Sequence, residues 1–322
     1  MGLRLGEEDF VAVKEKRDLR HLNVCSFKIL EKCNFPIVVK ADGLAAGKGV
    51  SICKNKKQAV KKSSEILKGK FKSSKIVILE EFLNGEEASY FIIVDNNNFK
   101  FFGTAQDHKR VYENDEGPNT GGMGAYSPAP IISKKIEKKI ILKIIKPTLT
   151  ALKRKKNPYT GFLYVGLMII KNEPYLIEYN IRMGDPECQV ILPRLNTDIT
   201  KIFLNSVSNK LNKTRIEWGE KKCMTIVLCA KGYPGSYKKN LRINNIKKVK
   251  LSKSDFIYHA GTKILKNELR SNGGRILNIS SIGNNYLKIR DKIISNIKKL
   301  NLKNIFYRKD IGWKVINKDE NN

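Results

Sequence analysis

The stretch from Pro36 to Val50, PIVVKADGLAAGKGV, carries the pattern from which the fold is predicted. Its β-branched residues Ile37–Val39 indicate a short buried strand that ends at Lys40. A loop of small residues follows, in which three glycines let the backbone approach a ligand closely and point successive N–H groups at an anion. Because Lys40 and Lys48 add positive charge, the stretch predicts a cradle for nucleotide phosphates between two strands.

The loop is not a Walker A motif, which requires G-x-x-x-x-G-K-[ST] followed by a helix. Here Gly49 follows Lys48, and the run Val50–Cys53 predicts a return strand where a helix would be needed. Taken alone, the pattern fits a flexible hairpin with a solvated lysine equally well. The choice between the two interpretations therefore depends on the motifs that follow.

The composition is that of a globular protein with a high positive charge. The 322 residues are enough for two or three domains, and 41% hydrophobic and 8% aromatic residues are ordinary for such domains. A formal net charge of +31 is one signature of a nucleic-acid partner. The excess is mostly lysine, spread over a chain also rich in isoleucine and asparagine, and these three residues share AT-rich codons. A genome with this codon bias would produce the pattern without any binding role, so the charge is interpreted mainly as background that can help to attract anionic substrates, and no specific nucleic-acid partner is expected.

The six cysteines form no CxxC pair and no zinc-ligand spacing, so free thiols in a reducing compartment are expected. No run approaches 18 apolar residues, and the N-terminus lacks the apolar region of a secretory signal. The sequence therefore predicts no membrane span and a cytoplasmic location.

Apolar periodicity predicts the elements that surround these motifs. Helices are expected over residues 56–67, 131–156, 190–211 (one helix or two) and 287–300, with Pro147 kinking or breaking the second. Strands are expected over residues 76–79, 88–95, 99–103, 163–170, 175–180, 224–230, 256–261 and 273–279. A change of composition near residues 212–214 predicts a separate C-terminal α+β domain.

Two polar segments follow predicted strands. The segment EEFLNGEE, residues 80–87, places backbone groups where they can pair with an adenine edge and an acid where it can accept from ribose hydroxyls. By itself it is more typical of an acidic turn. The segment QDHKR, residues 106–110, is expected in a loop after a strand, and its crowded donors and acceptors favour a substrate contact over an exposed polar turn.

The segment GPNTGGMGAYSP, residues 117–128, has too many small residues to pack a core, so we expect a mobile loop. A plain linker would be more polar and would not mix methionine and tyrosine with the glycines.

A candidate metal site lies at the end of the predicted strand 175–180. Glu178 and Asn180 share one face of it, and their oxygens are hard ligands suited to Mg²⁺ and ATP phosphates. An exposed strand face is the preferred interpretation of this pair alone. The charged residues Arg182, Asp185 and Glu187 follow at once, which favours a site.

Together these motifs resemble the phosphoribosylamine–glycine ligases (glycinamide ribonucleotide synthetases), a family of the ATP-grasp superfamily. The resemblance covers roughly residues 30–315, with the motifs in the family's order. It rests on VVKADGLAAGKGV, EEFLNGEEAS, QDHKR, GPNTGGMGAYSP, YTGFLYVGLM, IEYNIRMGDPE, AKGYPG, HAGTK, NGGR and RKDIGW. The combination of QDHKR, GPNTGGMGAYSP and NIRMGDPE gives the resemblance its specificity.

The resemblance implies an α+β ATP-grasp fold with two lobes around the nucleotide and a small C-terminal domain. The implied divisions are an unmatched segment 1–30, a small lobe 31–95 with the phosphate loop, a large lobe 96–213 with the metal and substrate site, and a C-terminal domain 214–322. The implied reaction is the second step of purine biosynthesis. ATP phosphorylates glycine, and the amine of 5-phosphoribosylamine attacks the glycyl phosphate to give glycinamide ribonucleotide, ADP and phosphate.

The resemblance also implies roles for single residues. Phosphates would be held by Lys40, Ala46, Gly47, Lys48, Gly49 and Val50; adenine would be framed by Glu80 and Leu83, and ribose would be bound by Glu87. Mg²⁺ or Mn²⁺ would be held by Glu178 and Asn180. Arg182 would neutralise the glycine carboxylate or its acyl phosphate, and Asp107, His108 and Lys109 would contact glycine or phosphoribosylamine. The loop 117–127 would close over the site.

One departure from the family pattern keeps alternatives open. Family members begin with an N-terminal domain of about a hundred residues that helps to hold the phosphoribosylamine phosphate, and no such pattern precedes residue 30. The alternatives are a ligase completed by a separate N-terminal polypeptide, a truncated ligase that binds ATP without turnover, and an ATP-grasp ligase with another amine acceptor. The alternative from outside the ligases is a basic nucleic-acid-binding protein.

Overall fold

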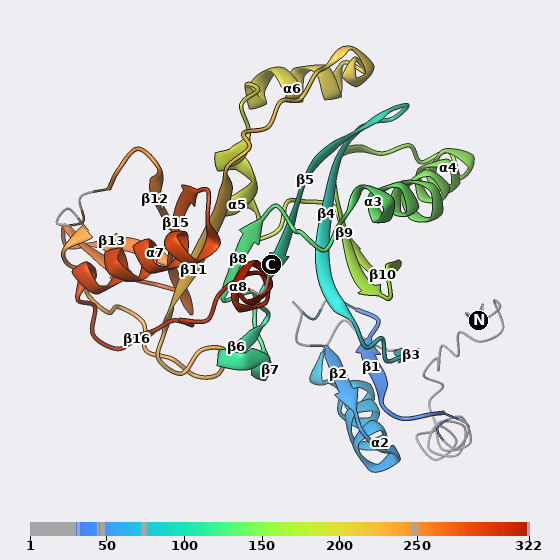
Figure 1. The fold of residues 1–322 in the computed structure, drawn as a ribbon. Helices are drawn as coiled ribbons and strands as arrows, with labels where there is room; N and C mark the ends of the chain where they lie inside the picture. Colours follow the sequence, from blue (N-terminus) through green and yellow to red (C-terminus); the bar gives the residue numbers. More distant parts are fainter. Residues whose placement is uncertain are drawn as a thin grey trace. The chain divides into compact units, whose positions relative to one another are not determined.

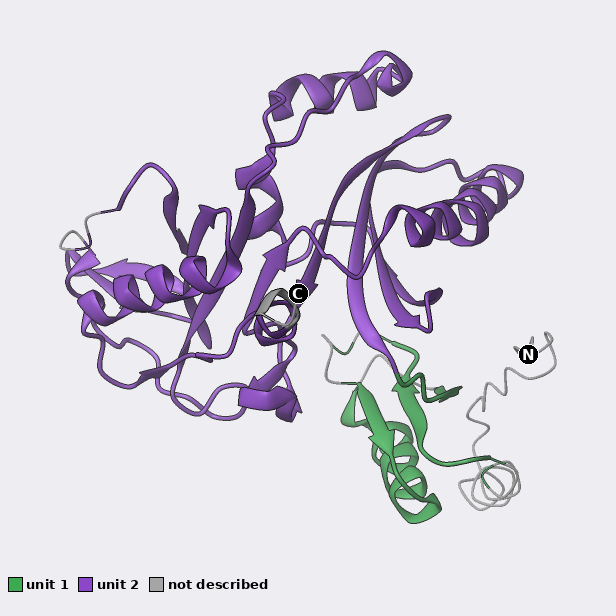
Figure 2. Cartoon of the chain, in the orientation of Figure 1, with its two compact units in different colours: residues 1–84 green, residues 85–322 purple. Residues whose placement is uncertain are grey.

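The computed structural model describes residues 30, 33–43, 45, 49–71, 76–246, 249 and 251–320. The chain divides into two compact units between Asn84 and Gly85 (Figure 2). Unit 1 holds residues 1–84 and unit 2 holds residues 85–322.

Unit 1 contains a three-stranded antiparallel sheet in the order β2-β1-β3, which packs against helix α2 (Figure 1). The elements are β1 (Ile37–Ala41), β2 (Val50–Cys53), α2 (Lys56–Glu65), a π turn (Ile66–Lys70) and β3 (Val77–Glu81). The predicted strand and return strand are confirmed, with Lys40 opposite Val50 in the β1–β2 register. Residues 44 and 46–48 of the predicted loop lie outside the described residues. Val39 and Ala59 are fully buried, because the apolar face of α2 packs against the sheet.

Unit 2 is built on one sheet in the order β10-β9-β4-β5-β8-β11-β15-β12, with β16 paired to β11. Every pairing in this sheet is antiparallel. Its strands are β4 (Glu86–Asp95), β5 (Phe99–Asp107), β8 (Gly124–Ser127), β9 (Thr160–Ile170), β10 (Glu173–Asn180), β11 (Lys222–Ala230), β12 (Asp255–His259), β15 (Arg275–Gly283) and β16 (Ile305–Phe306). Two small hairpins stand beside it, β6 (Arg110–Tyr112) with β7 (Glu116–Asn119) and β13 (Thr262–Leu265) with β14 (Glu268–Ser271).

Strand β4 is buried on both faces, which explains its nearly unbroken apolar sequence. Tyr90 and Ile92 pack on one face against the helical stretch α3 (Lys134–Ile140), a π turn (Ile141–Ile145) and α4 (Lys146–Arg154). Phe91 and Ile93 point to the other face, where residues of α5 (Cys188–Ile191) and α6 (Ile199–Val207) cover them. The alternation follows directly from the two-residue period of a strand.

The C-terminal part of the sheet has its own core. Residues of β11 and β15 pack against α7 (Tyr286–Leu300) and α8 (Trp313–Glu320), and Val227, Ile279 and Ile293 are completely buried there. Because β8 pairs with both β5 and β11, the sheet runs without interruption past residue 213. The predicted domain boundaries stay a prediction.

The glycine-rich segment differs from its prediction as a mobile loop. Its second half, Gly124–Ser127, is strand β8 in the middle of the sheet, and all four residues are buried. A Cβ atom at Gly124 would lie 2.7 Å from the Thr225 carbonyl oxygen and 2.8 Å from Ile311 Cγ1. Small residues therefore let this strand pass between its neighbours, and the assumption that they cannot pack a core is wrong.

Two further expectations are adjusted. Pro147 does not break the helix: the backbone stays helical from Ile145 through Lys146, and a π turn immediately precedes α4. The segment QDHKR does not lie wholly in a loop, since Gln106 and Asp107 are the last residues of β5. No helix among the described residues is long and apolar enough to cross a membrane.

Candidate active site

In unit 1 the described members of the predicted phosphate set, Lys40, Gly49 and Val50, flank the connection between β1 and β2. Lys40 forms an ion pair with Glu80 of β3, so the two predicted ligand residues neutralise each other in this conformation. A Cβ atom at Gly49 would lie 2.6 Å from Ala45 Cβ, and the Gly49 carbonyl oxygen accepts a hydrogen bond from the Ala41 N–H at 2.9 Å. Glycine is thus required where the turn closes onto β1.

Of the other residues predicted in this unit, the structure describes only some. Ala46, Gly47 and Lys48 lie outside the described residues. Val50 opens β2 and is 40% exposed, and Leu83 is half-buried in the segment after β3. The roles of all these residues stay predictions.

In unit 2 four neighbouring strands, β4, β5, β9 and β10, line one pocket. Its lining consists of Glu87, Ala88, Ser89, Asp107, Lys109, Tyr164, Gly166, Leu167, Ile177 and Glu178. Ser89 faces Gly166 across the β4–β9 pair, and Glu178 faces Gly166 across the β9–β10 pair. A Cβ atom at Gly166 would lie 3.0 Å from Glu178 Cγ, so this glycine leaves the room that Glu178 occupies. The structure thereby brings together four of the predicted residues, Glu87, Asp107, Lys109 and Glu178.

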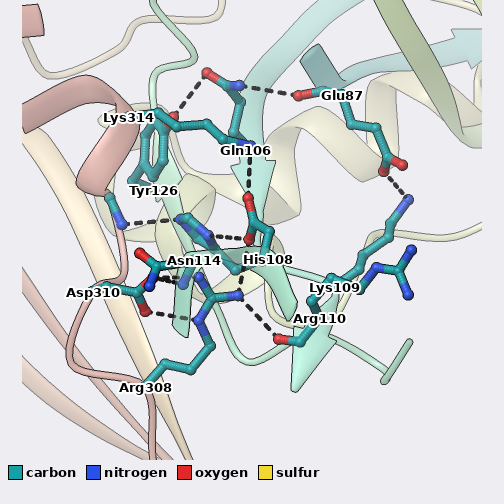
Figure 3. A network of polar contacts seen from close by, with 12 residues as sticks. Glu87, Gln106, His108, Lys109, Arg110, Asn114, Tyr126, Arg308, Asp310 and Lys314 are labelled. Atoms are coloured by element: carbon teal, nitrogen blue, oxygen red, sulfur yellow. Dashed lines mark hydrogen bonds and ion pairs between the residues drawn. The ribbon is translucent and has the colours of Figure 1, made fainter. Parts of the chain in front are cut away.

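A charged cluster forms the polar wall of this pocket. Lys109 Nζ lies 2.6 Å from Glu87 Oε2 (Figure 3). Burial raises the pKa of Asp107 to about 7, against the opposing attraction of Lys109. Burial alone would lower the pKa of Lys109, but attraction to Asp107 and Glu87 outweighs it and raises that pKa well above its ordinary value. The cluster therefore holds a permanent cation next to a carboxyl group that exchanges its proton near neutral pH.

Glu187 is a fourth carboxyl group at this site, and no individual role was predicted for it beyond its place in the charged motif NIRMGDPE. Its side chain is 4% exposed, and burial raises its pKa. The Ser89 hydroxyl lies 3.1 Å from Glu187 Oε1 and 3.1 Å from the Tyr164 hydroxyl. A serine in EEAS and a tyrosine in YTGFLYVGLM, both unassigned from the sequence, thus hold a buried acid behind Asp107 and Lys109.

The predicted metal pair lies at the end of β10. Asn180 Nδ2 donates to Glu178 Oε1 at 3.2 Å, which confirms that the two side chains share one face. Among the described residues, no group of three His, Cys, Asp or Glu side chains is arranged to hold a metal ion alone. The pair therefore fits an ion that takes most of its oxygens from phosphates and water, as Mg²⁺ does. Arg182 is exposed and donates to the Met183 carbonyl oxygen.

His108 lies on the other side of the strand end from this cluster. Its ring is 4% exposed, and its Nε2 accepts a hydrogen bond from the Gly312 N–H at 2.9 Å. Its Nδ1 lies 3.4 Å from Asp115 Oδ1. Gln106 is similarly occupied, donating to the Glu87 carbonyl oxygen and accepting from the Tyr126 hydroxyl (Figure 3). Neither residue is among those that line the pocket.

A buried arginine organises the surroundings of His108. Arg308 is 1% exposed and donates to the Arg110 carbonyl oxygen, to Asp115 and to both carboxylate oxygens of Asp310 (Figure 3). Burial would raise the pKa of Asp115, but hydrogen bonds from His108, Lys314 and Arg308 outweigh it and hold that pKa well below its usual range. The motif RKDIGW thereby joins the chain's last helix to the end of β5.

This fold and site define an ATP-grasp protein with an appended C-terminal domain. Residues 17–188 match the family model described as "Phosphoribosylglycinamide synthetase, ATP-grasp (A) domain", and residues 223–314 match the model for the "Phosphoribosylglycinamide synthetase, C domain". The chain belongs to the phosphoribosylglycinamide synthetase family. The ATP-grasp class implies use of ATP together with a divalent metal ion.

Relatives support the assignment. The chain is 42% identical over 286 residues to the phosphoribosylamine–glycine ligase of Agrobacterium fabrum, covering 88% of this chain and 67% of the relative. It is 43% identical over 289 residues to the enzyme of that name from Caldanaerobacter subterraneus, covering 89% and 69%. The solved phosphoribosylamine–glycine ligase of Thermotoga maritima is 33% identical with a TM-score of 0.77, covering 89% and 71%. A biotin carboxylase from Campylobacter jejuni shares the fold alone, at 15% identity and a TM-score of 0.65.

Proposed function

We propose that the chain catalyses the ATP-dependent ligation of glycine to 5-phosphoribosylamine through glycyl phosphate, which yields glycinamide ribonucleotide, ADP and phosphate. The observation that carries the proposal is the extent of the likeness. Relatives named for this activity match 88% of the chain at 42% identity, in both family domains. The pocket on β4, β5, β9 and β10 supports it, because it gathers four residues, Glu87, Asp107, Lys109 and Glu178, for which the resemblance implies ligand contacts.

Each residue role belongs to this proposal. Glu178 and Asn180 would hold Mg²⁺ or Mn²⁺, which neutralises phosphate charge when it is bound. Lys109 supplies a fixed positive charge, and Asp107 a carboxyl group with a pKa of about 7 that can accept a proton as the amine is acylated. Arg182, which is exposed, would neutralise the glycine carboxylate. Lys40, residues 46–50, Glu80, Leu83 and Glu87 are proposed for ATP.

The test is ADP release by the purified chain with Mg-ATP, glycine and freshly generated phosphoribosylamine, each omitted in turn. Release that needs both substrates supports the proposal, and release with another amine in place of phosphoribosylamine contradicts it. Since the chain spans about two thirds of its relatives' length, the assay is repeated with the N-terminal domain of such a relative added as a separate polypeptide. Activity that appears only then favours a ligase completed by a second polypeptide. The cytoplasmic location stays a prediction.

The metal role is tested apart from turnover. Glu178→Gln keeps the shape of the side chain and its neighbour Asn180 but removes the charge that a divalent cation needs. We expect at least a tenfold weaker binding of Mn²⁺ in the presence of ATP, measured by electron paramagnetic resonance of free Mn²⁺. Glu173→Gln is the matched control, because Glu173 lies on the same strand and pairs with Lys139 and Lys143. Equal Mn²⁺ binding by both variants would contradict the metal assignment.

A further inference from the structure

The backbone at the end of β5 fixes which side chains enter the pocket. The His108 N–H donates to the Gly124 carbonyl oxygen at 2.8 Å, and the Met123 N–H donates to the His108 carbonyl oxygen at 2.8 Å. His108 therefore continues the ladder between β5 and β8. Side chains alternate along such a ladder. Asp107 and Lys109 line the pocket, and His108 points to the other face, toward Arg308 and Asp310 (Figure 3).

Both ring nitrogens of His108 are engaged on that face. Because the Gly312 N–H donates to Nε2, this nitrogen carries a lone pair, and the ring proton belongs on Nδ1, directed toward Asp115. A doubly protonated ring would set its Nε2–H against the Gly312 N–H. The ring also packs against Tyr126, with 6.1 Å between centroids. In this arrangement His108 has no nitrogen free for a substrate.

The partner of His108 is a segment close to the end of the chain. Residues 308–314 supply Arg308, the Gly312 N–H and Lys314, and these groups contact Arg110, His108 and Asp115 respectively. Gly312 lies 204 positions from His108 in the sequence. The end of β5 is thus held by a segment remote in the sequence, which contacts it on the face opposite the pocket.

We propose that His108 is a positioning residue: it fastens the end of β5 to residues 308–314, so that Asp107 and Lys109 keep their places in the pocket. The proposal rests on the proposed function for the use made of Asp107 and Lys109. It replaces the role of substrate contact that the family resemblance implies for His108.

Three variants separate positioning from catalysis. His108→Gln places a carbonyl oxygen where Nε2 lies and keeps an acceptor for Gly312, but the amide cannot take up or transfer a proton. His108→Asn keeps a donor toward Asp115, and His108→Phe keeps neither contact. His259→Phe is the matched control, because His259 is exposed and its Nδ1 lies 3.0 Å from the Thr262 hydroxyl.

We expect His108→Gln to keep kcat within about fivefold of the wild type with an unchanged pH profile, and His108→Phe to lose 100-fold or more with little change in the KM for ATP. His108→Asn is expected between the two. If His108→Gln and His108→Phe are equally inactive while both remain folded, His108 acts in proton transfer and the proposal is overturned. The same conclusion follows if the pH dependence of kcat in His108→Gln lacks one of the pKa values seen in the wild type. Full activity of His108→Phe would overturn it as well.

Two readouts do not need turnover, so they separate this proposal from the proposed function. Nitrogen-15 chemical shifts of the His108 ring are expected to show a protonated Nδ1, and a protonated Nε2 would overturn the proposal. Hydrogen exchange of residues 106–109 and 308–314 is expected to rise at least tenfold in His108→Phe but less than threefold in His108→Gln. Unchanged exchange in His108→Phe would overturn the proposal, whatever the activity of the wild type.

Discussion

Asp107 is the residue whose chemistry is most strongly changed by its surroundings. Burial raises its pKa to about 7, whereas an exposed aspartate titrates near about 3.9. The folded chain therefore binds this proton more tightly than the unfolded chain does. The resulting stabilisation is fully present below about pH 4 and is lost as the pH rises through 7.

Asp107→Asn removes this dependence. Between pH 4.5 and pH 8 the free energy of unfolding of the variant, relative to the wild type, should rise by about 1–3 kcal/mol. Urea denaturation at four pH values measures the difference. Asp291→Asn, on the exposed side of α7, is the control and should follow the wild type throughout. If the free energy of unfolding changes with pH in the same way for Asp107→Asn and the wild type, the pKa of Asp107 is not raised by folding.

At this scale the sequence indicated candidate residues but not the contacts that their side chains make. The motif QDHKR pointed to Asp107 and Lys109, and both side chains line one pocket, while their contacts with substrate stay predictions. It could not separate them from His108, because the three are adjacent and only the strand's alternation sends them to different faces. Nor could it find Ser89 or Tyr164, since a serine and a tyrosine inside apolar strands are ordinary until Glu187 is seen beside them.

Strand β8 shows how packing overrides composition. Gly124→Ala should destabilise unit 2 by about 1–3 kcal/mol, because its Cβ would lie 2.7 Å from the Thr225 carbonyl oxygen in a sheet that cannot open there. Thermal unfolding of the variant measures this. Gly219→Ala is the matched control, since the nearest atom to its Cβ would be the Arg194 carbonyl oxygen at 3.4 Å, and it should change stability by less than about 0.5 kcal/mol. Equal effects of the two substitutions would argue against a tightly enclosed β8.

Two loops are joined by Arg275 at the start of β15. Its Nη1 donates to the carbonyl oxygens of Gly121 and Asp185, both at 2.6 Å, and its Nη2 lies 2.8 Å from Asp185 Oδ2. Arg275→Met leaves these acceptors without their donor and frees the loop that leads to Glu187. We expect glycine-dependent ADP release to fall tenfold or more, with the melting temperature lowered by only a few degrees.

The control for Arg275 is Arg270→Met. Arg270 also makes an ion pair, with Glu268, and donates to the Asn240 carbonyl oxygen, but it lies on the hairpin of β13 and β14. Its loss should leave ADP release unchanged. A similar decline in both variants would mean that any lost arginine in this part of the chain impairs the enzyme.

The two units should open separately. Val39→Ala creates a cavity in the small core of unit 1 and should cost about 2 kcal/mol there, while Val227→Ala does the same in unit 2. Hydrogen exchange is expected to rise in β1 and β2 for the first variant and in β11 and β15 for the second. If either variant raises exchange in both units alike, the chain unfolds as one cooperative body.

Over the whole molecule the sequence predicted the elements well and their connections less well. Short apolar runs identified β4, β9 and β10, and apolar residues at helical spacing identified the helix that covers them, because local apolar patterns reflect burial directly. The continuity of the sheet from β5 through β8 to β11 was not predicted, because the pairing of Gly124–Ser127 with Cys223–Ile226, which lie far apart in the sequence, leaves no local pattern.

The continuous sheet has a consequence for gene rearrangement and for expression of parts of the chain. The two matched family domains end and begin at residues 188 and 223, which invites a cut between them. Such a cut would separate β8 from β11 and leave each with unpaired backbone N–H and C=O groups along one edge. Exposed edges of this kind pair with strands of other chains and cause aggregation. We expect the domains to travel together through gene fusion and rearrangement, and each half made alone to be insoluble.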